Sequence, residues 1–163
     1  MVFAATAWHW LDPSLRFGQA AQLLKPGGIL AIVTGGHAFP ENFDPFFNEI
    51  QECYNAIGLA RVHWPPPPPE RAPDERASIE GCGLFEIVAV NHYLWTAEYT
   101  AKEYVDLLNT YPDHRALNPP QRESLLSEIE RRIDARPFKR VRKHYLTILH
   151  VARCLRTSPI HFL

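Results

Sequence analysis

The sequence predicts an α/β fold in which helices pack against a sheet that contains parallel strands. Two short apolar runs, at residues 2–6 and 29–33, show no polar alternation. Such runs are typical of parallel strands that are covered on both faces. A segment with helical spacing of apolar residues lies between them. Strand, helix and strand in about thirty residues form a βαβ unit, and its crossover is expected to be right-handed.

The helix of this unit has a start signal and a stop signal. Asp12 can cap the helix, and Pro13 fits its first position. The Pro-Gly-Gly turn at residues 26–28 ends it. We expect one apolar side to face the sheet, and that side comprises Leu15, Ala20, Leu23 and Leu24.

Small residues and one histidine follow the second strand, at residues 34–37. In open α/β sheets, ligands bind beyond the carboxyl ends of strands, and glycine allows a ligand to approach closely. Another helix is expected after Asp44, with Gly58 as the residue that closes it. Its apolar stripe comprises Phe46, Phe47, Ile50 and Tyr54.

Residues 64–77 are rich in proline and include five consecutive prolines at 65–69. Proline lacks the N–H that a sheet or helix interior needs, so we expect an extended excursion on the surface. Two interpretations are open: a spacer between elements, which we favour, and a ligand for a proline-recognition module. The organisation predicted is one domain over residues 1–156 with this excursion, followed by a tail at 157–163.

The second half of the chain contains two further strands and two helices in this prediction. The strands lie at residues 85–95 and 145–154. Thr100 and Glu103 have the spacing of a capping box ahead of one helix, and Asn118 precedes the other. The apolar face of the second helix comprises Leu125, Leu126, Ile129 and Ile133.

Composition and charge argue against several classes of function. The net charge of −1 over 163 residues gives no electrostatic footprint for nucleic acid. One basic run lies at residues 136–143, and a solvated loop with a strand entry is favoured there over an anion site. No apolar run reaches the ~20 residues of a membrane helix, and no signal peptide is recognisable. Three widely spaced cysteines suit reduced thiols, so we expect a cytoplasmic protein.

Several stretches together resemble the class I S-adenosylmethionine-dependent methyltransferases. These are AATAWHWLDP at residues 4–13, LLKPGGILAIV at 23–33, the segment from WTAEYT to SEIERRID at 95–134, and KHYLTILHVARC at 143–154. The resemblance implies a doubly wound sheet whose family strands 4, 5, 7 and 6 are present, with the last strand of the chain antiparallel. It also implies S-adenosyl-L-methionine as the cofactor and a small molecule as the methyl acceptor.

The resemblance covers only the C-terminal half of the family domain. The glycine-rich loop, the acidic residue that binds the ribose and the adenine contacts precede this half in the family, and no G-x-G-x-G segment occurs here. We therefore expect a fragment that is inactive alone. The alternative is a non-catalytic half-domain that pairs with a partner chain. In either case the first strand is left with an open edge, which favours self-association.

The resemblance places the stretch around Trp8 at the rim of the cofactor and substrate pocket. It suggests Thr6, Ala7 and Trp8 as cofactor-binding residues and His9 as a general base. The alternative for this stretch is structural: both of its tryptophans, Trp8 and Trp10, pack the following helix against the sheet. Methyl transfer asks little more of the protein than alignment of the acceptor and exclusion of water.

Other candidates lie in a polar, aromatic segment and at the end of the second strand. Tyr111 and Arg115 are candidates for substrate binding, with Arg115 suited to pair with a carboxylate, and His114 is a second candidate base. The alternative is an ordinary turn that ends a helix. His37 is the remaining substrate-binding candidate, against the alternative of a loop histidine. The eight histidines lack the spacing of a metal site, and no G-x-S-x-G nucleophile motif occurs.

Overall fold

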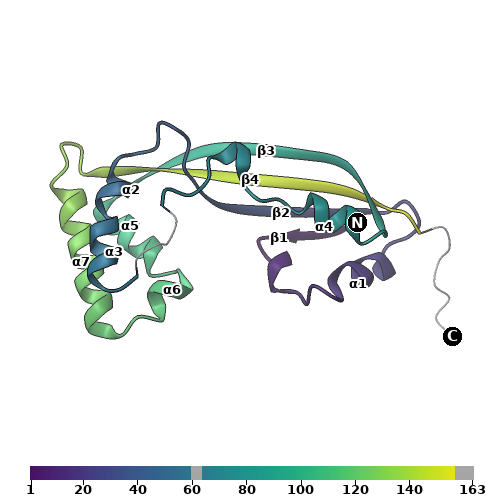
Figure 1. Cartoon of the computed structure of the whole chain (residues 1–163), viewed down its shortest axis with the longest axis horizontal. Coiled ribbons are helices and arrows are strands. Elements are labelled where there is room, and N and C mark those ends of the chain that lie inside the picture. Colours follow the sequence, from purple (N-terminus) through teal and green to yellow (C-terminus); the bar gives the residue numbers. More distant parts are fainter. Residues whose placement is uncertain (60–63, 157–163) are drawn as a thin grey trace. The chain divides into compact units, whose positions relative to one another are not determined.

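The computed structural model describes residues 1–59 and 64–156, and the predicted tail at 157–163 lies outside them. Its four strands are β1 (Val2–Ala5), β2 (Ile29–Ala38), β3 (Phe85–Thr100) and β4 (Arg140–Cys154). They form one sheet in the order β1-β2-β4-β3 (Figure 1). The mixed α/β class is as predicted, and the last strand of the chain lies between β2 and β3.

The pairings define the direction of each strand. β1 pairs with β2 in parallel, from Val2 opposite Leu30 to Ala5 opposite Val33. β4 is antiparallel to β2, because Cys154 exchanges backbone hydrogen bonds with residues 27 and 28 whereas Leu146 lies beside Gly35. The antiparallel last strand was predicted. Within the described residues β1 has one strand neighbour, so the expected open edge is present.

The described chain divides into two compact units. Unit 1 comprises residues 1–36, 71–94 and 146–156, and unit 2 comprises residues 37–59, 64–70 and 95–145. The three long strands contribute residues to both units. Each unit has its own hydrophobic core, and the organisation as one domain over residues 1–156 stays a prediction.

Unit 1 packs short helices against one face of its strands. These are the 3₁₀ turn η1 (Trp8–Trp10), α1 (Arg16–Leu23) and α4 (Arg76–Gly81) (Figure 1). β1 and β2 contribute alternate residues to the same core. The buried members are Trp8, Phe17, Ala20, Ala21, Leu24, Leu30, Ile32, Ile79, Phe85, Ala152 and Cys154.

Burial on both faces of the first strand was a wrong prediction. Val2 and Ala4 pack against the core, but Phe3 is 58% exposed because it projects from the opposite face. The apolar side that the sequence predicted for α1 is also wrong in part. Leu24 is buried, whereas Leu23 is 79% exposed, and the helix buries Phe17 and neighbouring alanines instead.

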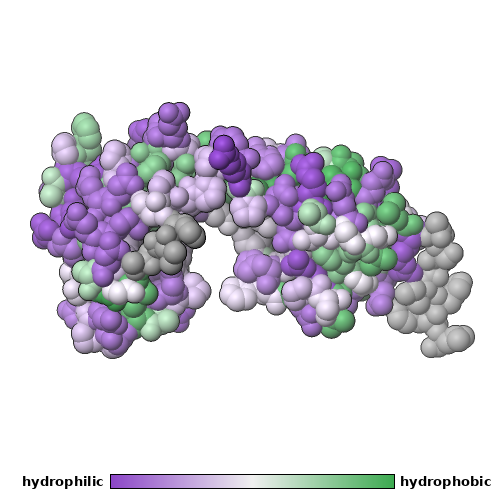
Figure 2. Space-filling view, in the orientation of Figure 1, coloured by the Kyte–Doolittle hydropathy of each residue, from purple (hydrophilic) through white to green (hydrophobic). Residues whose placement is uncertain are grey.

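Unit 2 is mainly helical. It contains α2 (Phe46–Glu49), α3 (Gln51–Ala56), α5 (Ala101–Leu108), α6 (Pro112–Arg115) and α7 (Pro119–Asp134). The outer surface over α2 and α7 is mostly hydrophilic (Figure 2). The buried core comprises Phe39, Phe46, Phe47, Ile50, Cys53, Ala101, Tyr104, Leu108, Leu125, Leu126, Ile129, Ile133 and Val141.

Local capping signals are confirmed in this unit. Thr100 and Glu103 form both halves of a capping box at the start of α5. The Asn118 side chain accepts a hydrogen bond from the backbone N–H of Gln121 at the start of α7. Gly58, the residue expected to close the helix after Asp44, has a φ of 78°, which a glycine adopts without strain.

Three strands are longer than predicted. β3 continues to Thr100, five residues beyond its predicted end. β2 continues to Ala38, so residues 34–37 belong to the strand rather than to a loop beyond it. β4 begins at Arg140, five residues before the predicted start, so the end of the basic run is strand. One of its members, Lys143, is only 2% exposed, and the solvated interpretation is therefore wrong for that residue.

The proline-rich segment is more structured than predicted. Pro69 is buried and opens the 3₁₀ turn η2 (Pro69–Arg71), and α4 begins at Arg76, inside the expected excursion. Trp64 packs against the core of unit 2, and its indole N–H donates to the Asn48 side chain. Proline fits the first turn of a helix, where its missing N–H has no partner to lose.

Neighbouring leucines of α1 provide a matched test of this packing. Leu24→Ala should lower the free energy of unfolding by about 2–4 kcal/mol, because it leaves a cavity in the core of unit 1. Leu23→Ala should change it by less than about 0.5 kcal/mol, because that side chain is already in solvent. Urea unfolding of both variants measures the difference, and equal losses would contradict the assigned buried face.

Candidate functional site

The carboxyl end of β1 has a strained backbone. Thr6 has a φ of 48°, and its N–H donates to the Val33 carbonyl at 2.8 Å. Positive φ is a genuine outlier for a β-branched residue and costs about 1–3 kcal/mol. Strained residues of this kind cluster at active sites and ligand clamps. The predicted cofactor-binding position therefore coincides with a local strain.

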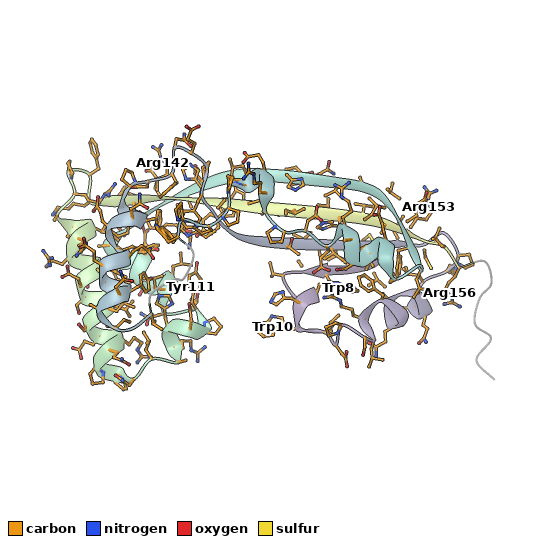
Figure 3. All side chains as sticks on the ribbon, in the orientation of Figure 1. Trp8, Trp10, Tyr111, Arg142, Arg153 and Arg156 are labelled. Carbon is orange, nitrogen blue, oxygen red and sulfur yellow. The ribbon has the colours of Figure 1, made fainter. Side chains whose placement is uncertain are left out.

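The two tryptophans of η1 have different environments (Figure 3). Trp8 is 2% exposed, and its ring packs 5.1 Å from the ring of Phe17 and 5.3 Å from the guanidinium of Arg16. Trp10 is 75% exposed, and the ring of His9 lies 4.8 Å from it. The packing alternative therefore describes Trp8, while His9 and Trp10 form an exposed aromatic pair beside Thr6 and Ala7.

One polar feature of Trp8 has no partner within its core. The indole Nε1 is buried and makes no hydrogen bond among the described residues. A buried N–H without an acceptor costs about 1–3 kcal/mol. The main chain of Trp8 is held by Arg16, which donates a hydrogen bond to the Trp8 carbonyl and forms a 3.0 Å ion pair with Glu75.

In unit 2, Lys143 lies at the centre of a cluster of tyrosines. Its ammonium donates to the hydroxyl of Tyr111 at 2.6 Å. The same Nζ lies 5.0 Å from the ring centroids of Tyr111 and Tyr145 and 5.9 Å from that of Tyr104. A cation that approaches the face of a tyrosine ring is attracted by its quadrupole. The aromatic faces and the phenol oxygen thus stabilise a buried charge.

The hydroxyls of this cluster are linked to one another. Tyr99 and Tyr145 share a hydrogen bond of 2.7 Å, and the hydroxyl of Tyr145 also interacts with that of Tyr111. Burial, together with the hydrogen bond to Tyr99, raises the pKa of Tyr145 well above its ordinary value. Burial also raises the pKa of Tyr111. Tyr111 and Tyr145 therefore remain protonated at neutral pH and act as hydrogen-bond donors.

An aromatic wall borders the cluster. Trp95 stacks on Tyr145, with ring centroids 4.4 Å apart and an interplanar angle of 14°. Trp95 is 47% exposed, so the cluster reaches solvent on this side. The ring of His37 lies 6.4 Å from that of Tyr145 and packs more closely, at 4.0 Å, against Phe39.

His114 is held between two polar partners. Its Nδ1 lies 2.9 Å from an Asp113 carboxylate oxygen, and its Nε2 lies 3.0 Å from the hydroxyl of Tyr54. Burial raises the pKa of Asp113, but its hydrogen bonds with His114 outweigh this and leave that pKa below its ordinary value. His114 is 4% exposed, so its ring is buried beside these two partners.

Three of the predicted residues thus belong to one neighbourhood in unit 2. His37 contacts Tyr145, Tyr111 bonds Lys143, and the ring of His114 lies 5.7 Å from that of Tyr111. Arg115 is exposed at the end of α6. The remaining predicted residues, Thr6, Ala7, Trp8 and His9, belong to unit 1.

The sequence did not single out Lys143, Tyr145 or Tyr99 as site residues. Lys143 was part of the basic run, Tyr145 was treated as a strand residue, and Tyr99 lay beyond the predicted strand at 85–95. One signal could have found two of them. In a strand starting at Arg140, residues 141, 143 and 145 share a face, so a lysine and a tyrosine follow the buried Val141 on the core side.

The remaining arginines of the basic region are mostly ion-paired. Arg136 binds both carboxylate oxygens of Asp44, and Arg132 contacts Glu52 and Glu128. Hydrogen bonds from Arg131 and Arg132 lower the pKa of Glu128 to about 2. Two open hollows of about 580 and 570 Å³ lie over this network. Within residues 1–59 and 64–156, no three potential metal ligands gather, and no helix is long and apolar enough to cross a membrane.

Comparisons with known proteins connect this fold with methyltransferases. A solved structure from Anaeromyxobacter dehalogenans, described as a "Putative Type II Methyltransferase", matches 95% of this chain and 64% of its own chain, with a TM-score of 0.56 and 18% identity. The chain has a methyltransferase fold. In this sheet β4 carries Lys143 and Tyr145 of unit 2, and the strained Thr6 directly follows β1.

Sequence comparison also finds methyltransferases, but over a shorter stretch of the chain. Uncharacterised methyltransferases of Mycobacterium bovis and Mycobacterium tuberculosis are 47% identical to this chain over 32 residues. The match spans 20% of this chain and 13% of the length of each relative. No family model matches the chain.

The strain at Thr6 leads to a testable expectation. Thr6→Gly should raise the free energy of unfolding by about 1 kcal/mol, because glycine adopts positive φ without a steric penalty. Thr34→Gly, in the regular part of β2, should lower it by about 0.5–1 kcal/mol instead. Thermal unfolding of both variants gives the two signs, and a destabilised Thr6→Gly protein would rule out the strained conformation.

Proposed function

We propose that this chain is part of an S-adenosylmethionine-dependent methyltransferase that acts on a small molecule. The likeness to a solved methyltransferase across 95% of the chain carries this proposal. That likeness concerns the fold, and the activity of the whole protein is our inference from it. Three free cysteines, two of them buried, support a cytoplasmic location as part of the same proposal.

The end of β1 fits one side of the cofactor. The exposed ring of Trp10 beside His9 offers a flat surface for a base, and the backbone of Thr6 and Ala7 is exposed next to it. The indole N–H of Trp8 is a donor without an acceptor among the described residues. We assign Thr6, Ala7 and Trp8 to cofactor binding on these grounds. When bound, S-adenosyl-L-methionine supplies an electrophilic methyl carbon.

The protein's part in methyl transfer is alignment, exclusion of water and removal of a proton. His9 is exposed and suited to act directly as a base. His114 is oriented by Asp113 and acts through the hydroxyl of Tyr54. We assign acceptor binding to His37, Tyr111 and Arg115. The ring of His37 lies beside that of Tyr145, and Tyr111 accepts a hydrogen bond from Lys143.

Cofactor affinity tests the proposal. The sequence has no glycine-rich G-x-G-x-G loop, which in dinucleotide-type folds places backbone N–H groups against a ligand's anionic end. We therefore expect isothermal titration of this chain with S-adenosyl-L-methionine to give only millimolar affinity. Addition of a separately expressed N-terminal half from a full-length relative should tighten binding by at least about 100-fold and allow methyl transfer. A mixture that neither binds the cofactor nor transfers methyl groups would contradict the proposal.

A second function is favoured by the open edge of the sheet. β1 pairs on one side only within the described residues, and Phe3 is 58% exposed. An apolar edge with unpaired backbone groups is a template for another strand. We infer that a non-catalytic half-domain, which pairs with another chain or with a second copy of itself, is the alternative to an enzyme.

Sedimentation over a tenfold range of concentration tests the edge. We expect oligomers that dissociate on dilution, and Phe3→Lys should shift the equilibrium to monomers because a charge on an edge strand opposes pairing. Leu23→Lys is a matched control, since it places the same charge on an exposed apolar residue of α1. A wild-type monomer at every concentration would refute self-association, and so would an identical effect of the two substitutions.

A further inference from the structure

We infer that the phenol cluster of unit 2, centred on Lys143, binds a planar, conjugated carboxylic acid as the methyl acceptor. This inference rests on the proposed function and names the class of its substrate. The cluster is defined as Lys143, Tyr99, Tyr111, Tyr145 and Trp95. It combines a buried ammonium, three phenol hydroxyls and an exposed aromatic face within one unit.

The hydrogen bonds of the cluster have a fixed polarity. An ammonium can only donate, so the Tyr111 oxygen must accept from Lys143 at 2.6 Å. The Tyr111 proton is then directed to another acceptor. Three phenol protons serve two phenol–phenol links, Tyr111 to Tyr145 and Tyr99 to Tyr145. At least one phenol O–H therefore points out of the network and seeks an acceptor.

A carboxylate is the acceptor that this polarity favours. An ionised oxygen only accepts, and it accepts from an O–H more strongly than the neutral oxygen of an alcohol or an amide does. The high pKa values of Tyr111 and Tyr145 keep their protons in place at neutral pH. Lys143, with 2% exposure, adds a positive charge in a region of low dielectric, where its attraction for an anion is stronger than in water.

The aromatic wall determines the shape of the ligand. Trp95 is stacked parallel on Tyr145, and its 47% exposure leaves surface for another flat group. The half-buried rings of Tyr99 and Tyr111 border the same network. A ligand whose carboxylate is conjugated with a planar group can place its oxygen on the phenol hydroxyls and its flat part against the indole.

Two other cations near the start of β4 are engaged by carboxylates, with Arg136 on Asp44 and Arg142 on Glu98. Figure 3 labels Arg142, the arginine that pairs with Glu98. Those pairs are wholly or partly exposed, so added salt screens them, whereas the ammonium of Lys143 is buried.

Calorimetric binding of trans-cinnamate to the whole chain tests the inference, with the isosteric neutral cinnamamide as the ligand control. No methyl donor is present, so the result does not depend on methyl transfer or on cofactor affinity. We expect cinnamate to bind at least about tenfold more tightly than cinnamamide, as charge-assisted hydrogen bonds require. Failure to bind cinnamate, or equal binding of the two compounds, would overturn the inference while leaving the methyltransferase proposal untouched.

Substitutions locate the binding. Lys143→Met should reduce cinnamate affinity at least about tenfold and abolish the preference over cinnamamide. Lys102→Met removes an exposed lysine of the same unit and should leave affinity unchanged. If Lys143→Met lowers Tm, Tyr111→Phe is the second variant. It removes the phenol oxygen that accepts from Lys143 and changes no charge. It should also reduce the preference for cinnamate over cinnamamide. Unchanged selectivity in a folded variant of either residue would refute the assignment.

Discussion

The position of β4 is the constraint on which both units depend. This strand lies between β2 and β3, and it contributes Val141 to the core of unit 2 and Ala152 and Cys154 to the core of unit 1. Its antiparallel pairing with β2 is fixed at one end by the hydrogen bonds of Cys154 with residues 27 and 28. A one-residue slip of β4 would reverse its faces, expose those core residues and remove Lys143 from Tyr104 and Tyr111.

The same strand explains why a lysine can be buried in unit 2. Lys143 follows Val141 on the core side, so the register that buries the valine also buries the ammonium. Burial of an isolated charge is costly unless other groups compensate for it. The Tyr111 oxygen and three aromatic faces provide that compensation. The chemistry of this region is therefore a consequence of strand register and not of a loop that could rearrange independently.

Local signals in the sequence predicted the elements well, because those signals act within a few residues. The capping box at Thr100, the cap at Asn118 and the glycine after α3 depend only on neighbouring backbone groups. The apolar face of α7 follows from helical spacing, and its four predicted residues are buried. The α/β class came from the two apolar runs and the βαβ unit, and the antiparallel last strand came from the family resemblance. The structure agrees with both.

The errors concern features that depend on distant parts of the chain. A short apolar strand does not reveal whether one face or both are covered, and the exposure of Phe3 depends on where the helices pack. Leu23 has helical spacing but lies outside the core, because Phe17 and two alanines fill the interface. Lys143 was grouped with neighbouring arginines because charge alone was considered, whereas the alternation of β4 decides its burial.

Amide hydrogen exchange tests the central role of β4 most directly. Interior strands are paired on both sides, so their amides exchange only through large openings, whereas edge strands exchange through local fraying. The structure predicts that the amides of residues 146–154 in β4 belong to the slowest class in unit 1, while those of β1 exchange much faster. Exchange of β4 as fast as that of β1 would contradict its position between β2 and β3, and with it the burial of Lys143.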